Sequence, residues 1–281
     1  MKTHPVALLT LLGLSVSGFA ADSAKPAPLR VLLITGGCCH DYATQKDLIK
    51  KGLESRANIT VDQVHVDVTK ENATKPPLPI YGNPTYAKGY DVVIHDECAA
   101  GISDQAVIEG VLAPHLGGTP AVNLHCAMHC YRIGSANEPA TIGTPHGLWF
   151  EYLGLQSSGH GPQEPIDLHF TTPHPVTKGL SDWTTIKEEL YNNIQVFPSA
   201  TPLANGKQTY KAKDGTEKTS DVVVAWTNVY GPKKTRVFST TIGHNNATVE
   251  DTRYLDLVTR GVLWSAGKLT DEGKPAEGFA K

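Results

Sequence analysis

The sequence lacks several features that would assign it to a function class at once. It has no block of basic residues: 25 Lys and Arg stand against 28 Asp and Glu, so nothing indicates a nucleic-acid partner. It has no internal repeat, and its 40% hydrophobic and 19% charged residues exclude a disordered chain, collagen or a coiled coil. Methionine (2) and phenylalanine (6) are scarce, whereas histidine, with 12 residues, is abundant.

The N-terminus predicts export. Lys2 supplies a positive start, residues 6–16 are mostly apolar, and Gly18-Phe19-Ala20 has the small-x-Ala pattern of a cleavage site. The apolar run is shorter than the ~20 residues that cross a bilayer, and no later run approaches that length, so we expect no membrane span in the mature chain. We therefore expect a signal peptide at 1–20, a flexible lead-in at 21–29 and a periplasmic or secreted protein.

The five cysteines have neither a CxxC pair nor zinc-finger spacing. In an exported protein they can form at most two disulfides, which leaves one thiol over. Cys38 and Cys39 are neighbours, and we expect them not to pair with each other, because the small ring that this closes needs a strained peptide. The pairing of Cys98, Cys126 and Cys130 stays open.

The first half of the chain alternates short apolar runs with helical patterns. Residues 30–35 (RVLLIT) are predicted to form a strand that is buried on both faces, and further strands are predicted at 59–68, 90–95 and 120–125. Helices are predicted over 42–56 and from an N-cap at Ser103 to Leu112. This order predicts an α/β fold: a doubly wound, mostly parallel sheet with helices on both faces.

The second half is less regular. Residues 134–165 are rich in Gly and Pro and are predicted to form a long loop. Strands are expected at 166–170, 221–226 and 235–241, and a closing helix at about 250–266. No break in composition divides the chain, so we predict a single domain at 30–267, followed by a tail at 268–281.

Three histidines are expected at one edge of the predicted sheet. His40 follows the first strand, His95 ends the third and His125 ends the fourth. Ligands of open parallel sheets bind beyond the carboxyl ends of the strands, so these side chains are candidates for a functional site. The alternative for any one of them is a hydrogen-bonded polar residue at a strand end. Other titratable residues are expected beside them: Cys38, Cys39, Asp41, Asp96, Glu97, Cys98 and Cys126.

The segment 125–130 (HCAMHC) combines two signals. A strand that turns directly into a helix has the shape of a nucleophile elbow. His125 and His129 are spaced i, i+4, which places both on one helical face where they can share a metal ion. The segment lacks the Glu of an HExxH motif, so a zinc protease is not indicated. A helix start with two hydrogen-bonded histidines is the alternative.

Short segments, taken in order from about residue 30 to 267, resemble the ThuA-like (trehalose utilisation) family, whose fold is similar to class I glutamine amidotransferases and flavodoxin-like proteins. Each segment is weak alone, and their order carries the resemblance. They are 31–41 (VLLITGGCCHD), 90–93 (YDVV), Gly117-Gly118 before the strand that ends in His125, 174–180 (HPVTKGL), 188–192 (EELYN), Ala225-Trp226, 236–238 (RVF) with Thr240, Gly243-His244 and 260–264 (RGVLW).

The resemblance also exposes a difference. Amidotransferases of this fold have a nucleophilic Cys at the elbow and a His-x-Glu pair downstream. Here His125 takes the elbow position, as in ThuA-like proteins, and Cys126 comes one residue later. His244 is followed by Asn245 and Asn246, so the His-x-Glu pair is missing. The sequence identifies no base for Cys126.

The resemblance implies carbohydrate metabolism, with oxidised (3-keto) sugars or glycosides as the small-molecule partners. A keto group acidifies the neighbouring C–H, so isomerisation or elimination needs a base and a group that stabilises the enolate. We place His125, His40 and His244 at the catalytic centre. We expect the substrate to be bound by Glu189, Tyr191, His95, His129 and His160.

The cofactor question is left open by the sequence. His40, His125, Glu189 and His244 are candidate ligands of a divalent metal ion, because neutral imidazoles and carboxylates suit zinc, manganese or iron. For Glu189 the alternative is a solvated acidic face that it shares with Glu188.

The leading hypothesis is an exported enzyme that acts on a sugar or glycoside by His-based acid–base or metal-assisted chemistry (isomerisation, elimination or hydrolysis). Two alternatives stay open: a non-catalytic carbohydrate-binding protein on the same fold, and a hydrolase that depends on Cys126. The sequence indicates no oligomeric state.

Overall fold

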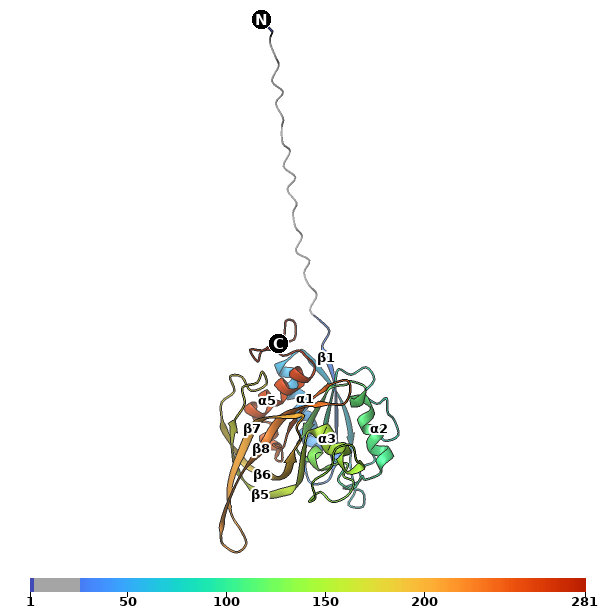
Figure 1. Ribbon diagram of the computed structural model, residues 1–281, viewed down its shortest axis with the longest axis vertical. Helices are drawn as coiled ribbons and strands as arrows, with labels where there is room; N and C mark the ends of the chain where they lie inside the picture. The colour runs from blue at the N-terminus through green and yellow to red at the C-terminus, as the bar shows by residue number, and fades with distance from the viewer. Residues whose placement is uncertain (3–25) are drawn as a thin grey trace.

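The computed structural model describes residues 1–2 and 26–281. Nine strands of the described residues form one sheet, in the order β2-β1-β3-β4-β9-β8-β7-β5-β6, with helices packed on it (Figure 1). The predicted signal peptide lies outside the described residues, apart from its first two. Within the described part of the chain, no helix has the length and apolar character needed to cross a membrane.

The first half of the chain supplies the parallel part of the sheet. β1 (Leu29–Gly37), β2 (Ile59–Val66), β3 (Val92–Cys98) and β4 (Ala121–Leu124) pair in parallel, with α1 (Tyr42–Arg56) and α2 (Gln105–Leu116) between them. β1 is a continuous apolar run because both of its faces are covered. Val31 and Leu33 pack into one core, and Leu32 and Ile34 pack into the other.

The second half adds an antiparallel part. β5 (Leu155–Phe170), β6 (Trp183–Val196), β7 (Ala200–Lys211) and β8 (Glu217–Tyr230) pair antiparallel, and β8 joins them to β9 (Thr235–Thr240), which is parallel to β4. The predicted α/β class is confirmed, but the sheet is mixed rather than mostly parallel. The connections β7–β8 and β8–β9 are too short for a crossover helix, so these strands must run antiparallel.

Two local predictions are corrected. Residues 134–165 are not one long loop, because η2 (Pro145–Gly147), α3 (Leu148–Leu153) and the first part of β5 lie within them. β5 is irregular, and its register against β6 shifts several times between Gln156 and Gln163, which fits its Gly and Pro content. The N-cap of α2 is Asp104 rather than Ser103, and its side chain accepts a hydrogen bond from the Val107 N–H at 3.1 Å.

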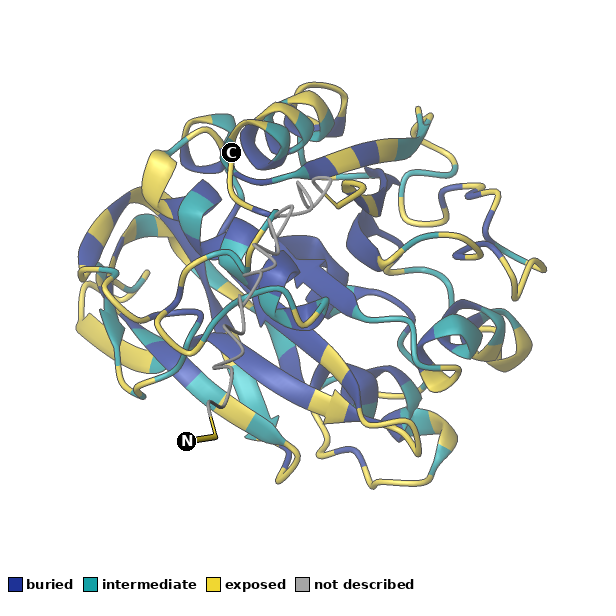
Figure 2. Ribbon diagram, turned by 90° about the horizontal axis from the view of Figure 1, so that it is seen from above, coloured by how far each residue is buried: buried dark blue, intermediate teal, exposed yellow. Residues whose placement is uncertain are grey.

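Helices cover both faces of the sheet, as expected. α1 and α5 (Thr252–Ser265) pack into one core with Leu53 and Val258, and α2 and α3 pack into the other with Leu112 and Trp149. Figure 2 shows the buried residues concentrated on the central strands, between the two helical layers. The short η1 (His125–His129) follows β4 directly, and α4 (Asn246–Val249) follows β9 after a short connection. The fold therefore leaves the carboxyl ends of the parallel strands free for a site.

α5 and β9 pack so closely that Gly261 has no room for a side chain, because a Cβ there would collide with the Phe238 ring. We expect Gly261→Ala to lower the free energy of unfolding by about 1–3 kcal/mol, measured by urea denaturation. The control is Gly110→Ala in α2, where a Cβ meets nothing within 4 Å. It should raise stability by up to about 1 kcal/mol, because Ala favours a helix. Equal stability of the two variants would contradict the packing.

Candidate functional site

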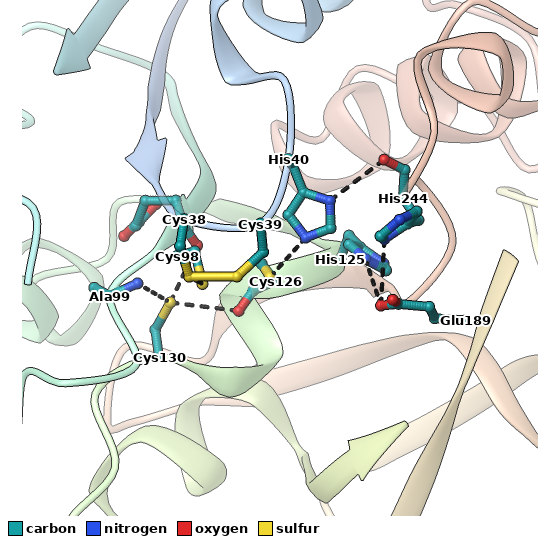
Figure 3. The surroundings of a disulfide bond; sticks show 11 residues. Cys38, Cys39, His40, Cys98, Ala99, His125, Cys126, Cys130, Glu189 and His244 are labelled. Atoms are coloured by element: carbon teal, nitrogen blue, oxygen red, sulfur yellow. Dashed lines mark hydrogen bonds and ion pairs between the residues drawn. A yellow bond between two sulfur atoms is a disulfide. The ribbon is translucent and has the colours of Figure 1, made fainter. Parts of the chain in front are cut away.

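Four functional side chains come together at the carboxyl edge of the parallel strands. His40 lies between β1 and α1, His125 begins η1 directly after β4, and His244 lies between β9 and α4. Glu189 comes from β6, which approaches the same edge from the antiparallel part of the sheet. Figure 3 shows the four residues pointing toward one another.

Glu189 lies between the histidines. Its Oε2 atom is 3.5 Å from His125 Nε2 and 3.3 Å from His244 Nδ1, and its Oε1 atom is 3.6 Å from His160 Nδ1. The ring centre of His40 is 4.6 Å from those of both His125 and His244. The three histidines that the sequence assigns to the catalytic centre therefore meet beside one carboxylate.

The His125 ring makes a hydrogen bond through Nδ1, and this bond determines what its Nε2 atom presents to Glu189. His125 adopts φ +38° where β4 turns into η1, and its Nδ1 donates to the Thr241 carbonyl at 2.6 Å. Its Nε2 atom is buried and has no hydrogen-bond partner among the described residues. A lone pair on Nε2 would repel the Glu189 carboxylate, and a proton shared between the two groups or a metal ion bound by both would remove this repulsion.

A divalent metal ion would find three ligands here. One ligand atom each of His125, Glu189 and His244 lie within 4.8 Å of one another. In the structure the Gln163 amide donates to His244 Nε2 at 2.8 Å, which leaves a proton on the Nδ1 atom that faces Glu189. To bind a metal, Nδ1 would release that proton and the Gln163 amide would turn, so that its oxygen accepts from Nε2.

The pKa shifts of Glu189 and His244 reflect their contact. Burial raises the pKa of the Glu189 carboxyl, but the contacts with the His125 and His244 imidazoles outweigh it, and the net shift is strongly downward. The contact with Glu189 raises the pKa of His244. Both shifts favour a charged pair of carboxylate and imidazolium, for which the Gln163 amide would also have to turn its oxygen toward His244 Nε2.

His40 is held from both sides. Its Nδ1 donates to the His244 carbonyl at 3.3 Å, and its Nε2 accepts from the Cys126 thiol at 2.9 Å. The structure thus supplies a base for Cys126 that the sequence does not identify. Burial, then the nearby His125 and His244, lower the pKa of His40 to about 3. The pKa of Cys126 is raised, first by a hydrogen bond with Cys98 and then by burial, so both shifts favour the neutral thiol and imidazole.

Glu188 positions the loop that carries His244. Its Oε2 atom accepts from the backbone N–H groups of Gly243 at 3.4 Å and His244 at 3.0 Å, and its Oε1 atom accepts from that of Asn245 at 3.2 Å. Glu188 is 0% and Glu189 7% exposed, so the two do not form a solvated acidic face. In the sequence only the adjacent pair Glu188-Glu189 indicates that Glu188 could hold this loop. The pair alone does not distinguish buried carboxylates from a solvated acidic face.

The other predicted substrate-binding residues divide into two groups. Tyr191 stacks on His129, with ring centres 4.2 Å apart, and lies 5.1 Å from the His125 ring. His129 is partly buried, with its Nε2 atom 3.0 Å from Ser157 Oγ, and desolvation, followed by Arg132, lowers its pKa. His160 is partly exposed next to Glu189. These three extend the site along β5 and β6.

The structure places His95 in a different cluster. Its Nδ1 donates to Glu97 Oε1 at 2.8 Å, and its Nε2 atom is 3.1 Å from His115 Nε2. Tyr131 also donates to the Glu97 carboxylate, at 2.7 Å. The cluster is fully buried against α2 and α3, so His95 belongs to a polar network in the core.

A cavity of about 630 Å³ opens beside the group formed by His40, His125, Glu189 and His244, here called the histidine cluster. Of the four central residues, His40 and His244 line it. The other lining residues are Cys39, Asp41, Ile186, Asn245, Asn246 and Ala247. Asn246 donates to the Asp41 carboxylate at 2.8 Å, which joins two sides of the opening. Asn245, Asn246 and Ile186 are not predicted from the sequence as site residues, because nothing in their local pattern indicates that they lie beside His40.

Cys38 and Cys39 form a disulfide, so the expectation that they do not pair is wrong. The backbone explains the pairing: Gly36 and Gly37 adopt φ +134° and +109°, and Cys39 adopts φ +86°. This left-handed path at the end of β1 turns the two adjacent side chains toward each other. Cys98, Cys126 and Cys130 are free thiols.

Together these features define an α/β protein with a histidine–carboxylate site at the carboxyl edge of its parallel strands. Residues 30–265 match the family model described as ThuA, trehalose utilisation, so the chain belongs to this family. The resemblance expected from the sequence is confirmed, and the family description connects the chain with carbohydrate metabolism. No curated protein matches the chain.

One solved structure shows the same fold. A ThuA-like protein from Parabacteroides merdae is 22% identical with a TM-score of 0.61, and the match covers 90% of this chain and 97% of that one. A glutamine amidotransferase from Thermotoga maritima is 10% identical, over 85% of this chain and 96% of that one. Its TM-score of 0.38 is too low to add to the argument.

The Glu188 contacts give a test of how the site is built. Glu188→Ala removes the acceptor of three buried or partly buried backbone N–H groups, so we expect it to lower the free energy of unfolding by about 2–4 kcal/mol. Hydrogen exchange of the amides at 243–245 should also become faster. The matched control is Glu164→Gln on β5, whose carboxylate is partly exposed and 3.9 Å from Lys187 Nζ. It should change stability by less than about 0.5 kcal/mol. Unchanged exchange at 243–245 in Glu188→Ala would show that Glu188 does not hold the loop.

Proposed function

We propose that this protein is an enzyme of carbohydrate metabolism that moves protons at a sugar carbon next to a carbonyl group, as in a 3-keto sugar or glycoside. The family match supports the carbohydrate class. The single observation that carries the enzyme assignment is Glu189, buried between His125 and His244, of which His244 lines a cavity. A protein that only binds sugar has no need for a buried carboxylate that shares protons with two imidazoles.

The cavity supports the substrate class. Asp41, Asn245 and Asn246 line it with the carboxylate and amide groups that bind sugar hydroxyls. His244 reaches both this cavity and Glu189, so it is the residue placed to exchange a proton with the substrate. Glu189 then stabilises the imidazolium, and His125 holds Glu189 from the buried side.

The enolate oxygen also needs positive charge. This positive charge can come from the imidazolium of His244 or from a divalent ion held by His125, Glu189 and His244. These are two mechanisms for one function, and a chelator distinguishes them. We further infer from residues 1–20 that the enzyme works outside the cytoplasm.

A second candidate function is favoured by one contact. Cys126 Sγ lies 2.9 Å from His40 Nε2, which is the distance of a nucleophile from its base. A hydrolase that depends on Cys126 would use this pair. Cys126 is buried, and the pKa shifts of both groups favour the neutral thiol and imidazole, so the first proposal is preferred.

The test is turnover of a panel of glycosides and their 3-keto forms, followed by NMR. We expect His125→Ala and Glu189→Gln each to lower turnover by at least about 100-fold, because each removes a group that holds or moves the proton. The control is His174→Ala, whose ring packs on Trp264 away from the cluster. It should retain activity.

Other outcomes would redirect the assignment. Loss of turnover in Cys126→Ala with full activity in Glu189→Gln would favour the hydrolase. Saturable sugar binding without any product would favour a binding protein. Adding a chelator to the wild type would show which of the two sources of positive charge operates.

A further inference from the structure

A third sulfur lies next to the Cys38–Cys39 disulfide. Cys98 Sγ is 3.5 Å from Cys38 Sγ, and the sulfurs of Cys38, Cys39 and Cys98 lie within 4.8 Å of one another. Figure 3 shows this group on the side of His40 that faces away from Glu189. This sulfur cluster (Cys38, Cys39, Cys98) takes no part in the proposed sugar chemistry.

The approach of Cys98 is fixed by the sheet. β1 and β3 pair in parallel, and Gly37 lies opposite Cys98 in their register. A Cβ on Gly37 would collide with the Cys98 backbone, so glycine is required for this approach. The short Sγ–Sγ distance therefore follows from strand pairing and does not depend on a loose loop.

The surroundings favour Cys98 as the attacking thiol. A hydrogen bond from Cys126 lowers the pKa of Cys98, although burial opposes this. Cys130 has a different role: its Sγ donates to the Glu97 carbonyl at 3.1 Å and accepts from the Ala99 N–H at 2.9 Å, which ties it to the backbone. Cys98 is thus the thiol placed to react with the disulfide.

We propose that the Cys38–Cys39 disulfide is a thiol–disulfide exchange site, in which Cys98 attacks Cys38 and releases Cys39. Cys98 loses its proton and its sulfur forms a bond to Cys38 Sγ. The Cys38–Cys39 bond breaks, and Cys39 leaves as a thiolate that takes up one proton. One disulfide is lost and one is formed, so no oxidant or reductant is consumed.

The backbone conformation of Cys39 favours the exchange in the direction that forms the Cys38–Cys98 disulfide. Cys39 holds a left-handed φ of +86°, which is costly for a residue with a Cβ, and the Cys38–Cys98 isomer frees Cys39 from the ring that requires it. The released thiol is exposed and lines the cavity beside His40. Its partners would be small thiol-reactive molecules, such as low-molecular-weight disulfides. This inference does not rest on the proposed function.

Peptide mapping tests the proposal because trypsin separates the two isomers. Cys38 and Cys39 share the tryptic peptide 31–46, whereas Cys98 lies in the peptide 89–132. The folded wild-type protein would be treated with iodoacetamide at pH 8 without reductant, then unfolded and blocked with N-ethylmaleimide. We expect about one carbamidomethyl group per molecule, on Cys39, and a disulfide between peptides 31–46 and 89–132, because alkylation of Cys39 drives the exchange to completion.

Cys98→Ser removes the attacking thiol and should show no label on Cys39 and an intact disulfide within peptide 31–46. Cys130→Ser is the matched control, since it removes a buried thiol outside the sulfur cluster and should be labelled on Cys39 like the wild type. Cys98→Ala serves if Cys98→Ser does not fold, as judged by circular dichroism. A wild type that stays unlabelled on Cys39, or labelling of Cys39 in the Cys98 variants, would overturn the proposal.

Discussion

The Glu188 carboxylate is the contact on which the site depends. It accepts hydrogen bonds from the backbone N–H groups of residues 243–245. These bonds join β6 to the loop after β9, although three other strands lie between β6 and β9 in the sheet. Adjacent residues of a strand point to opposite faces, so fixing Glu188 also fixes the direction of Glu189. One residue therefore positions the loop that carries His244, and its neighbour faces the imidazoles. The site forms only where the antiparallel part of the sheet meets the parallel part.

The sequence predicts the parallel part of the fold well, because it is buried on both faces. The continuous apolar run around Val31–Ile34 predicts a strand that is buried on both faces. The placement of His40 and His125 follows because ligands of open parallel sheets bind beyond the carboxyl ends of the strands. Only the end of β5, at 166–170, is predicted, because Gly, Pro and a shifting register interrupt the alternation before it, and β6 is not predicted. His95 shows a further limit: β3 continues to Cys98, so His95 lies in the middle of the strand and faces α2 and α3 instead of the site.

The partners of Glu188 and Glu189 could not be predicted for a different reason. Two adjacent carboxylates usually mark a solvated surface, and burying them is costly unless each charge is compensated. The compensation comes from residues that are distant in the chain: backbone N–H groups after β9 for Glu188, and the imidazoles of His125 and His244 for Glu189. The same separation hides the base of Cys126, because His40 comes from the first strand and Cys126 from the fourth.

His40 connects the two chemical clusters of the protein. Cys126 has a single S–H proton and two acceptors, His40 Nε2 and the sulfur of Cys98. When Cys98 is a thiolate, it competes for that proton, and His40 Nε2 then loses its donor. When Cys98 is bonded to Cys38, it has no negative charge, and the Cys126 thiol continues to donate its hydrogen bond to His40 Nε2. The state of the sulfurs therefore changes the hydrogen bonding of the ring that packs against both His125 and His244.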